Sequence, residues 1–320
     1  MKRLLTNIAL LLCLTLAVLY VLNYATDEGL KKSKRGDYAQ WNDIYGARVN
    51  ADVLIMGSSQ AKNDLNPVIM DSILHTRSYN LGLIQYRFTL QYLRLKVYLQ
   101  HNVAPRCIIQ VVDLRNLELN DGLYSYEQFF PYLRDTLIKQ GMKQYPDIFT
   151  FPRLYFPLFK YNNHWGLIKE GIRLYADRKY IVTEDKNRGF EIITSEWDSS
   201  FSEFKKSYPE GISGVVNERV LHEFEMYLDY CNRQHIRVVL VYAPVFYEEL
   251  PMERNNAAIK GLYKKLAVQF NAILLDYSHD TLSMDRRYFY NSLHLNYRGS
   301  AIFSAHLADD MKGILQNIRR

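Results

Sequence analysis

Residues 51–57 read "ADVLIMG", a short apolar run that ends in a glycine. A run that is apolar at consecutive positions is typical of a buried strand in a parallel sheet, because helices cover both faces of such a sheet. Similar runs recur as "SYNLGL" (78–83), "PRCIIQVVDL" (105–114), "IRVVLVYAPV" (236–245) and "AILLDYS" (272–278). We expect each of them to contribute a short strand.

Segments with a helical spacing of apolar residues separate these runs. Pro67 limits where the first of them can begin, and Asn217 is a suitable N-cap for the third. The segments cover residues 60–75, 88–101, 217–234, 254–270 and 300–316. Strands that alternate with amphipathic helices predict an α/β fold with a doubly wound, mainly parallel sheet. Its two halves are residues 51–119 and 216–320.

Residues 120–215 interrupt this alternation. They are rich in Tyr, Phe, Pro and Trp, as in "YPDIFTFPRLYFPLFKYNNHWG" (145–166). We interpret them as an insertion packed over one end of the sheet, which serves either as a lid or substrate platform or as a purely structural subdomain. The chain has 26 tyrosines, which fit a groove lined with flat amphipathic rings for sugars as well as an ordinary Tyr-rich core.

The N-terminus carries a leader. Residues 4–22 are apolar at all but three positions, and this length is close to the roughly 20 residues that cross a hydrocarbon core. We expect residues 1–23 to be an uncleaved transmembrane anchor, with a cleaved signal sequence as the alternative. Residues 24–50 then form a stalk and a first helix.

Charges around the leader bear on its orientation. Lys2 and Arg3 favour a cytoplasmic N-terminus, whereas the cluster "KKSKR" (31–35) lies downstream and favours the opposite. We place residues 23–320 outside the cytoplasm, on the periplasmic or extracellular side of the cytoplasmic membrane.

Composition excludes several other classes of function. The net charge is +6, and the basic residues are interleaved with acidic ones, so we expect no nucleic-acid partner.

Cys107 and Cys231 fall in a predicted strand and a predicted helix, where we expect inert buried thiols, with a disulfide between them as the alternative. The chain has no HExxH, paired CxxC, P-loop or GxGxxG motif. The sequence therefore predicts no metal and no nucleotide cofactor.

Polar residues follow the predicted strands, where ligands bind in open α/β sheets. Gly57-Ser58-Ser59 follows the first strand, Asn80-Leu81-Gly82 the second, and Asp113-Leu114-Arg115-Asn116 the third. The segment "YNSLHLNYRGS" (290–300) follows the last. Serine and histidine at such positions indicate nucleophilic catalysis, because a serine hydroxyl attacks well only when a base takes its proton.

These blocks resemble the SGNH, or GDSL-type, superfamily of esterases and acyltransferases. That superfamily has a Gly-Asp-Ser block, a Gly and an Asn after successive strands, and a D-x-x-H block near the C-terminus. The stretches "GSSQ…LNP" (57–67), "YNLG" (79–82) and "HLNYRGSAIFS" (294–304) are similar to membrane-anchored members found with cell-surface polysaccharide O-acylation systems. The resemblance covers residues 51–116 and 217–316 and implies a flavodoxin-like three-layer sandwich.

The resemblance also implies roles for single residues. Ser59, in preference to Ser58, takes the position of the nucleophile, and His294 that of the catalytic base. Ser59 and Gly82 would supply backbone N–H groups to an oxyanion hole, and Asn116 takes the position of the oxyanion asparagine.

Asn291 stands where the superfamily has the aspartate of its D-x-x-H block, and Ser58 replaces the Asp of the first block. The third residue of such a triad fixes the imidazole tautomer and stabilises the imidazolium. An asparagine can accept from Nδ1–H through its carbonyl oxygen but supplies no charge. Asp276, at the end of the preceding predicted strand, or a backbone carbonyl is the alternative group to orient His294.

Two functions follow from these residues. The first is a membrane-anchored serine esterase or O-acyltransferase that acts on acyl esters, acetyl esters above all, of cell-envelope glycans. The second is a non-catalytic glycan-binding or scaffold subunit that partners an integral-membrane acyltransferase, which the Asn291 substitution favours.

Overall fold

The computed structural model describes residues 1–120 and 122–318, which form two compact units. Unit 1 consists of Met1–Gly46 and Ser125–Asp185, and unit 2 of Ala47–Tyr124 and the chain from Lys186 onward. The aromatic segment 120–215 is therefore divided. Most of it associates with the N-terminal segment, and its last part belongs with the sheet.

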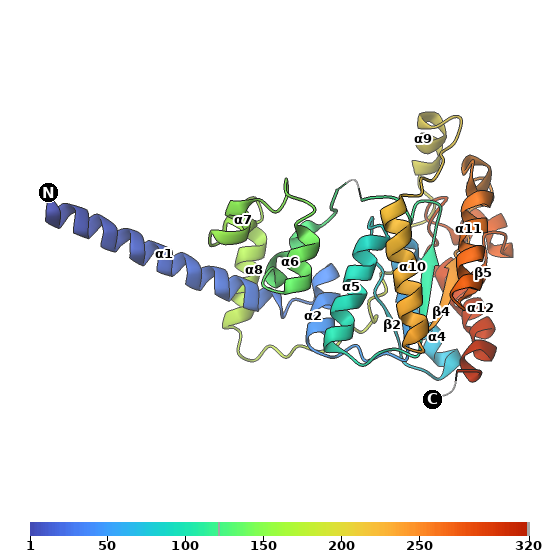
Figure 1. Ribbon diagram of the computed structural model, residues 1–320, viewed down its shortest axis with the longest axis horizontal. Helices are drawn as coiled ribbons and strands as arrows, with labels where there is room; N and C mark the ends of the chain where they lie inside the picture. The colour runs from blue at the N-terminus through green and yellow to red at the C-terminus, as the bar shows by residue number, and fades with distance from the viewer. Residues whose placement is uncertain (121, 319–320) are drawn as a thin grey trace. The chain divides into compact units, whose positions relative to one another are not determined.

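Unit 2 is built on a five-stranded, all-parallel sheet (Figure 1). The strand order is β2-β1-β3-β4-β5, and Val53 pairs with Ser78 on one side and with Cys107 on the other. The five strands lie within the five apolar runs: β1 (Val53–Met56), β2 (Ser78–Asn80), β3 (Cys107–Val112), β4 (Arg237–Tyr242) and β5 (Ile273–Asp276). This confirms the predicted parallel α/β sheet.

Helices cover both faces of the sheet. On one face, Phe88 packs edge-on against Phe224 and Phe224 against Tyr263, which joins α5 (Phe88–His101), α10 (Glu218–Arg233) and α11 (Asn256–Gln269). The other face carries α3 (Ser59–Asp64), α4 (Pro67–Leu74) and α12 (Tyr297–Gln316), whose apolar side chains share one core with β1 and β3. Burial on both faces explains why the strands are apolar without alternation.

The first predicted helix is interrupted. The expected helix over 60–75 is divided into α3 and α4, with Leu65 and Asn66 between them. The side chain of Asn66 accepts from the Val68 N–H at 2.9 Å, and Pro67 occupies the first position of α4. The Asn66 cap and a proline that cannot continue the preceding helix both favour the start of a new helix at Pro67.

The remaining elements of unit 2 are short. They are α9 (Ser200–Ser207), η3 (Leu250–Met252), η4 (Thr281–Met284) and η5 (Arg286–Tyr288). Asn217 caps α10 as predicted, since its side chain accepts from the Val220 N–H at 3.3 Å. Cys107 and Cys231 are buried free thiols.

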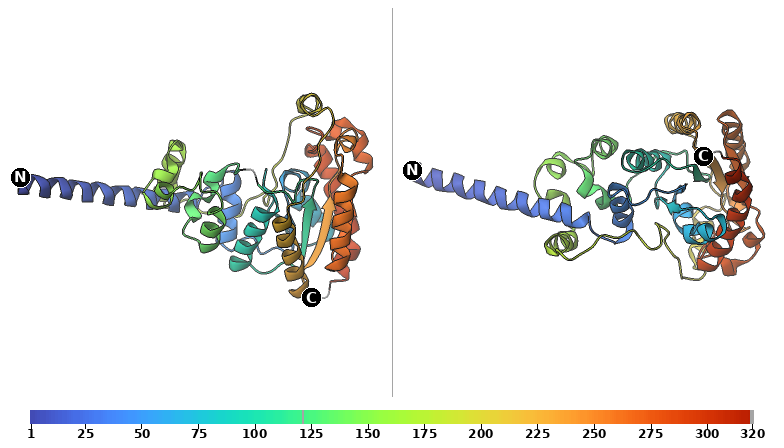
Figure 2. Two further views of the ribbon diagram at one scale, coloured as in Figure 1. Left: turned by 45° about the horizontal axis from the view of Figure 1, so that its top comes forward. Right: turned by 90° about the horizontal axis from the view of Figure 1, so that it is seen from below.

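Unit 1 is helical and surrounds the end of one long helix. Its elements are α1 (Lys2–Leu30), α2 (Gly36–Tyr45), η1 (Tyr126–Tyr132), α6 (Thr136–Met142), α7 (Phe151–Tyr155), η2 (Phe159–Tyr161) and α8 (Trp165–Ala176). Within the described residues, α1 is the one helix long and apolar enough to cross a membrane. Its N-terminal part extends away from the rest of unit 1 (Figures 1 and 2).

The last two turns of α1 are fixed inside unit 1. Asp27 accepts a hydrogen bond from the Lys160 ammonium at 2.8 Å and another from the Tyr161 hydroxyl at 2.6 Å. Burial lowers the pKa of Lys160, and the Asp27 carboxylate opposes that shift. Removing either partner of a buried ion pair leaves an uncompensated buried charge, so these contacts hold the end of α1 within the folded unit, beyond the expected span.

Gly171 allows α8 to cross α1 at close range. A Cβ at Gly171 would lie 2.5 Å from the Thr26 carbonyl oxygen, which is backbone and cannot move aside easily. We expect Gly171→Ala to lower the free energy of unfolding of unit 1 by about 1–3 kcal/mol through overpacking. Gly166→Ala on the same helix meets no atom within 4 Å and should be neutral or stabilising by up to about 1 kcal/mol. Thermal unfolding of both full-length variants in detergent measures the difference, and equal midpoints would contradict it.

Candidate active site

The turn after β1 places Ser59 at the carboxyl end of the sheet. Gly57 has φ +145°, and a Cβ there would lie 2.8 Å from that of Ala61 and 2.9 Å from that of Val111, so only glycine fits. Ser59 is the first residue of α3. In this strand order β2 and β3 lie on opposite sides of β1, so the sheet has a topological switch point between β1 and β3. Ligands of open α/β sheets bind beside such a point.

Ser59 and His294 are hydrogen-bonded although 235 positions separate them in the chain. The Ser59 Oγ lies 2.7 Å from the His294 Nε2. On the other side of the ring, the His294 Nδ1 lies 2.9 Å from the Asn291 Oδ1. A hydroxyl, an imidazole and a third oriented group in this order form the constellation of nucleophilic serine catalysis.

The orientation of Asn291 is set by its own backbone turn. Its Oδ1 also accepts the N–H groups of Leu293 and His294, each at 3.0 Å. An atom that faces two backbone donors must be the carbonyl oxygen and not the amide nitrogen. The His294 Nδ1 therefore carries the proton, and Nε2 presents its lone pair to the Ser59 hydroxyl. Asn291 thus selects the tautomer that a general base requires.

Residues of α3 hold the loop that carries His294. The Gln60 side-chain amide donates to the Leu293 carbonyl at 3.0 Å, and Asp64 Oδ1 accepts the Leu295 N–H at 2.9 Å. Burial raises the pKa of Asp64 well above its usual value, against the opposing effect of that hydrogen bond. Ser59, Gln60 and Asp64 thus each contact the loop, so the distance between nucleophile and base is fixed by one short helix.

The imidazole of His294 is held in its neutral form. Burial lowers the pKa of His294 from 6.5 to about 4, and the carboxylates of Asp113 and Asp198 only partly oppose this shift. A neutral ring at neutral pH can accept a proton. The low pKa also makes it a weak base, and Asn291 adds no charge to stabilise the imidazolium.

The structure does not bring the predicted oxyanion donors together. The Gly82 N–H donates to the Asn80 side-chain oxygen at 2.9 Å, so it is already paired. Asn116 is only 1% exposed, and its amide oxygen accepts from Gln91. The Asn116 amide nitrogen, which is the group that would donate to an oxyanion, is buried without a hydrogen-bond partner among the described residues. Neither Gly82 nor Asn116 lines the cleft that holds Ser59 and His294, so this conformation does not support the two assignments. The Ser59 N–H, in the first turn of α3, has no intrahelical partner.

Asp276 does not orient His294. Its carboxylate forms an ion pair with the Lys260 ammonium at 2.9 Å and accepts from the Ser278 hydroxyl at 2.7 Å. The group at His294 Nδ1 is instead Asn291, so the structure does not support Asp276 as the orienting group.

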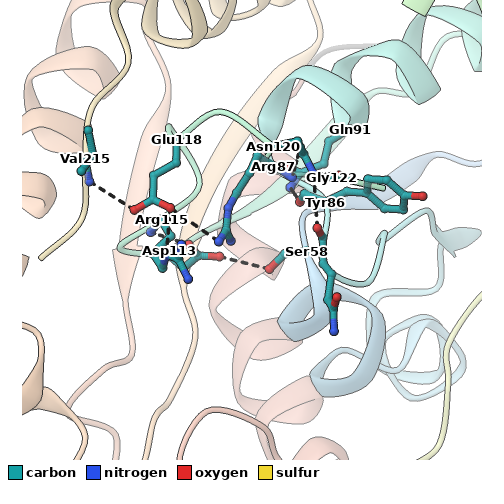
Figure 3. A network of polar contacts seen from close by, with 11 residues as sticks. Ser58, Tyr86, Arg87, Gln91, Asp113, Arg115, Glu118, Asn120, Gly122 and Val215 are labelled. Carbon is teal, nitrogen blue, oxygen red and sulfur yellow. Dashed lines mark hydrogen bonds and ion pairs between the residues drawn. The ribbon is translucent and has the colours of Figure 1, made fainter. Parts of the chain in front are cut away.

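Ser59 and His294 line a cleft of about 1310 Å³ that lies wholly within unit 2. One wall is a polar network in which Arg87 and Glu118, which the sequence did not single out, join Ser58, Asp113 and Arg115 (Figure 3). The Ser58 hydroxyl donates to Asp113 at 3.0 Å, so the two adjacent serines have different partners. Glu118 pairs with Arg115 at 2.7 Å and with Arg87 at 3.5 Å.

A second wall of the cleft carries the carboxyl groups of Glu249 and Glu253. Burial, reinforced by Glu249 and Asp113, raises the pKa of Glu253 to about 8. Burial also raises the pKa of Glu249. With a pKa of about 8, Glu253 is mostly protonated at neutral pH, and a protonated carboxyl group both donates and accepts hydrogen bonds, which suits neutral polyhydroxylated ligands. Only their positions in the folded chain, and no motif, identify these residues.

A comparison with known protein families found no family model that matches the chain, and a comparison with curated proteins found no matching sequence. Among residues 1–120 and 122–318, no group of three or more His, Cys, Asp and Glu side chains is arranged to hold a metal ion.

Proposed function

We propose that the chain is an SGNH-type serine esterase or O-acyltransferase, with Ser59 as nucleophile and His294 as general base. The observation that carries the proposal is the 2.7 Å contact between Ser59 Oγ and His294 Nε2, in a ring whose tautomer Asn291 selects. The five-stranded parallel sheet agrees with the fold that the resemblance implies.

In the proposed reaction, the Ser59 oxygen attacks an acyl carbonyl while His294 Nε2 takes the hydroxyl proton. The tetrahedral oxyanion is met by the Ser59 N–H. Collapse of the intermediate breaks the ester bond, and His294 returns the proton to the leaving alcohol. The acyl group on Ser59 then passes to water or to a sugar hydroxyl, again with His294 as base.

The cleft and the leader support the proposed substrate class. The cleft walls carry paired Arg and Glu side chains and two carboxyl groups with raised pKa values, which match the hydroxyl groups of a glycan. We place α1 in the cytoplasmic membrane and unit 2 on its periplasmic or extracellular side. The proposed substrates are acyl esters, above all acetyl esters, of cell-envelope glycans, and no cofactor takes part.

One group of observations favours a second candidate function, that of a non-catalytic glycan-binding or scaffold subunit beside an integral-membrane acyltransferase. Asn291 has no charge, the pKa of His294 is low, and the Gly82 N–H is already paired with Asn80. The test that separates the two functions is Ser59-dependent turnover of an activated acetyl ester such as p-nitrophenyl acetate. Glycan binding without such turnover would support the second candidate.

The pH dependence should reflect the neutral imidazole. Because His294 must be unprotonated to act as base and burial lowers its pKa to about 4, kcat/KM for an acetyl ester should be flat from neutral pH down to about pH 5. Below pH 4 it should fall tenfold per pH unit. The measurement is ester hydrolysis across this range, and an acidic limb centred near pH 6.5 would contradict the lowered pKa of His294.

A further inference from the structure

The burial of α1 changes abruptly along its length. Its first 17 residues, Lys2–Val18, are exposed, whereas Ala25, Thr26, Asp27, Gly29 and Leu30 are buried inside unit 1. About 20 residues at 1.5 Å per residue cross the roughly 30 Å hydrocarbon core. If the span begins at Leu4, its other end lies near residues 20–24, where α1 enters the folded part of unit 1.

The segment around α7 lies at this level of α1. The Tyr20 hydroxyl donates to the Tyr155 carbonyl at 3.5 Å, and Asn23 Oδ1 accepts the Leu158 N–H at 3.0 Å. The side chains that this segment exposes are large and apolar: Phe151 is 65% exposed and Phe156 55%. Phe151 contacts the rings of both Tyr155 and Phe156, so these side chains form one cluster.

Helix α8, which crosses α1 at Thr26 and Gly29, adds a second apolar stripe beside α1. Trp165, Ile168, Ile172 and Tyr175 follow each other at helical spacing, and Trp165 is 67% exposed. The Tyr175 ring packs edge-on against Tyr24 of α1 at 6.0 Å. The adjoining face of α8, with Leu167, Gly171 and Leu174, is the buried one.

We propose that these aromatic side chains form a second membrane contact, an aromatic collar that inserts into the bilayer interface where α1 leaves the hydrocarbon core. The collar consists of Phe151, Tyr155, Phe156, Phe159, Trp165 and Tyr175, each exposed in unit 1.

Three features favour lipid as the occupant of the collar. The collar adjoins the membrane span within one folded unit, so a spanning α1 brings it to the surface of the bilayer. Its Trp and Tyr rings are the side chains enriched at membrane interfaces. The Lys139 ammonium lies 5.4 Å from the centre of the Tyr155 ring, where its charge can reach the headgroups. The collar would hold unit 1 against the membrane, which a single helix does not do, and it does not depend on the chemistry of Ser59.

The test uses the full-length chain in nanodiscs made with phospholipids brominated on the upper acyl chain, which quench nearby tryptophan. The difference in emission between wild type and Trp165→Phe isolates the signal of Trp165. We expect that signal to be blue-shifted and quenched by roughly half or more relative to unbrominated nanodiscs. Trp165 is exposed, so its replacement by Phe should leave folding intact, and circular dichroism checks this.

A matched control places a tryptophan on the same unit but away from the collar. Ile181 is 76% exposed, and nearby Thr183 accepts from the Lys34 ammonium, beyond the buried end of α1. The emission that Ile181→Trp adds to the Trp165→Phe variant should be as in water, without quenching. The proposal is overturned if Trp165 emits as in water, and also if it is blue-shifted but unquenched, since protein would then cover the collar.

Discussion

Asn291→Asp increases turnover of an activated acetyl ester by roughly 10²- to 10⁴-fold, because a carboxylate at this position stabilises the imidazolium that forms in the transition state. The acceptor geometry is already present, since the Asn291 Oδ1 receives His294 Nδ1–H and two backbone N–H groups. The new charge also raises the pKa of His294 above its present value of about 4. The acidic limb of kcat/KM should therefore move to higher pH. Steady-state hydrolysis from pH 3 to 8 measures both effects.

Asn291→Leu is the opposing control for this prediction. Leucine has a similar size but no acceptor, so the His294 tautomer is no longer selected and turnover should fall by about 10²-fold or more. Thermal unfolding of the variant checks that the loop still folds. If Asn291→Asp and Asn291→Leu both leave turnover unchanged, residue 291 does not act through His294.

Ser59→Ala removes ester turnover, by about 10³-fold at least, because the hydroxyl is the atom that attacks the acyl carbonyl. The Ser59 side chain is partly exposed in the cleft, and α3 retains Gln60 and Asp64 as contacts to the loop. We therefore expect the loss without unfolding. Rates of p-nitrophenyl acetate hydrolysis corrected for the uncatalysed reaction measure it.

Ser58→Ala is the matched control on the adjacent serine. Its hydroxyl donates to Asp113 and does not contact His294. Losing that bond should lower stability by about 1.5–3 kcal/mol, as for a hydrogen bond to a charged group, but should change turnover by less than about tenfold, because it involves neither reacting atom. Equal losses in the two variants would show that the serines share one structural role.

The strands of unit 2 were predictable because their signal is local. Each of the five apolar runs is a strand, and both faces of the sheet are covered. The break between α3 and α4 was only partly visible, since Pro67 marks it but the capping role of Asn66 depends on its side-chain orientation. Unit 1 was not predictable, because its core joins α1 to segments more than 100 residues away, such as Asp27 with Lys160.

The candidate site was also predictable only where the signal is local. Ser59 and His294 could be placed near each other because the carboxyl ends of parallel strands meet at one edge. The oxyanion positions could not be assigned, because only the folded chain shows that the Gly82 N–H pairs with Asn80 and that the Asn116 amide nitrogen is buried. Asp64 carried no sequence signal, since its contact with Leu295 exists only in the folded chain.

The most direct measurement compares the Asn291→Asp chain with the same chain carrying Ser59→Ala. Our account predicts that the turnover of p-nitrophenyl acetate gained by Asn291→Asp is lost when Ser59 is also replaced, because the added charge acts through His294 on the Ser59 hydroxyl. Turnover that persists without Ser59, or no gain in the Asn291→Asp chain while Ser59 is present, would contradict a nucleophilic Ser59 activated by His294.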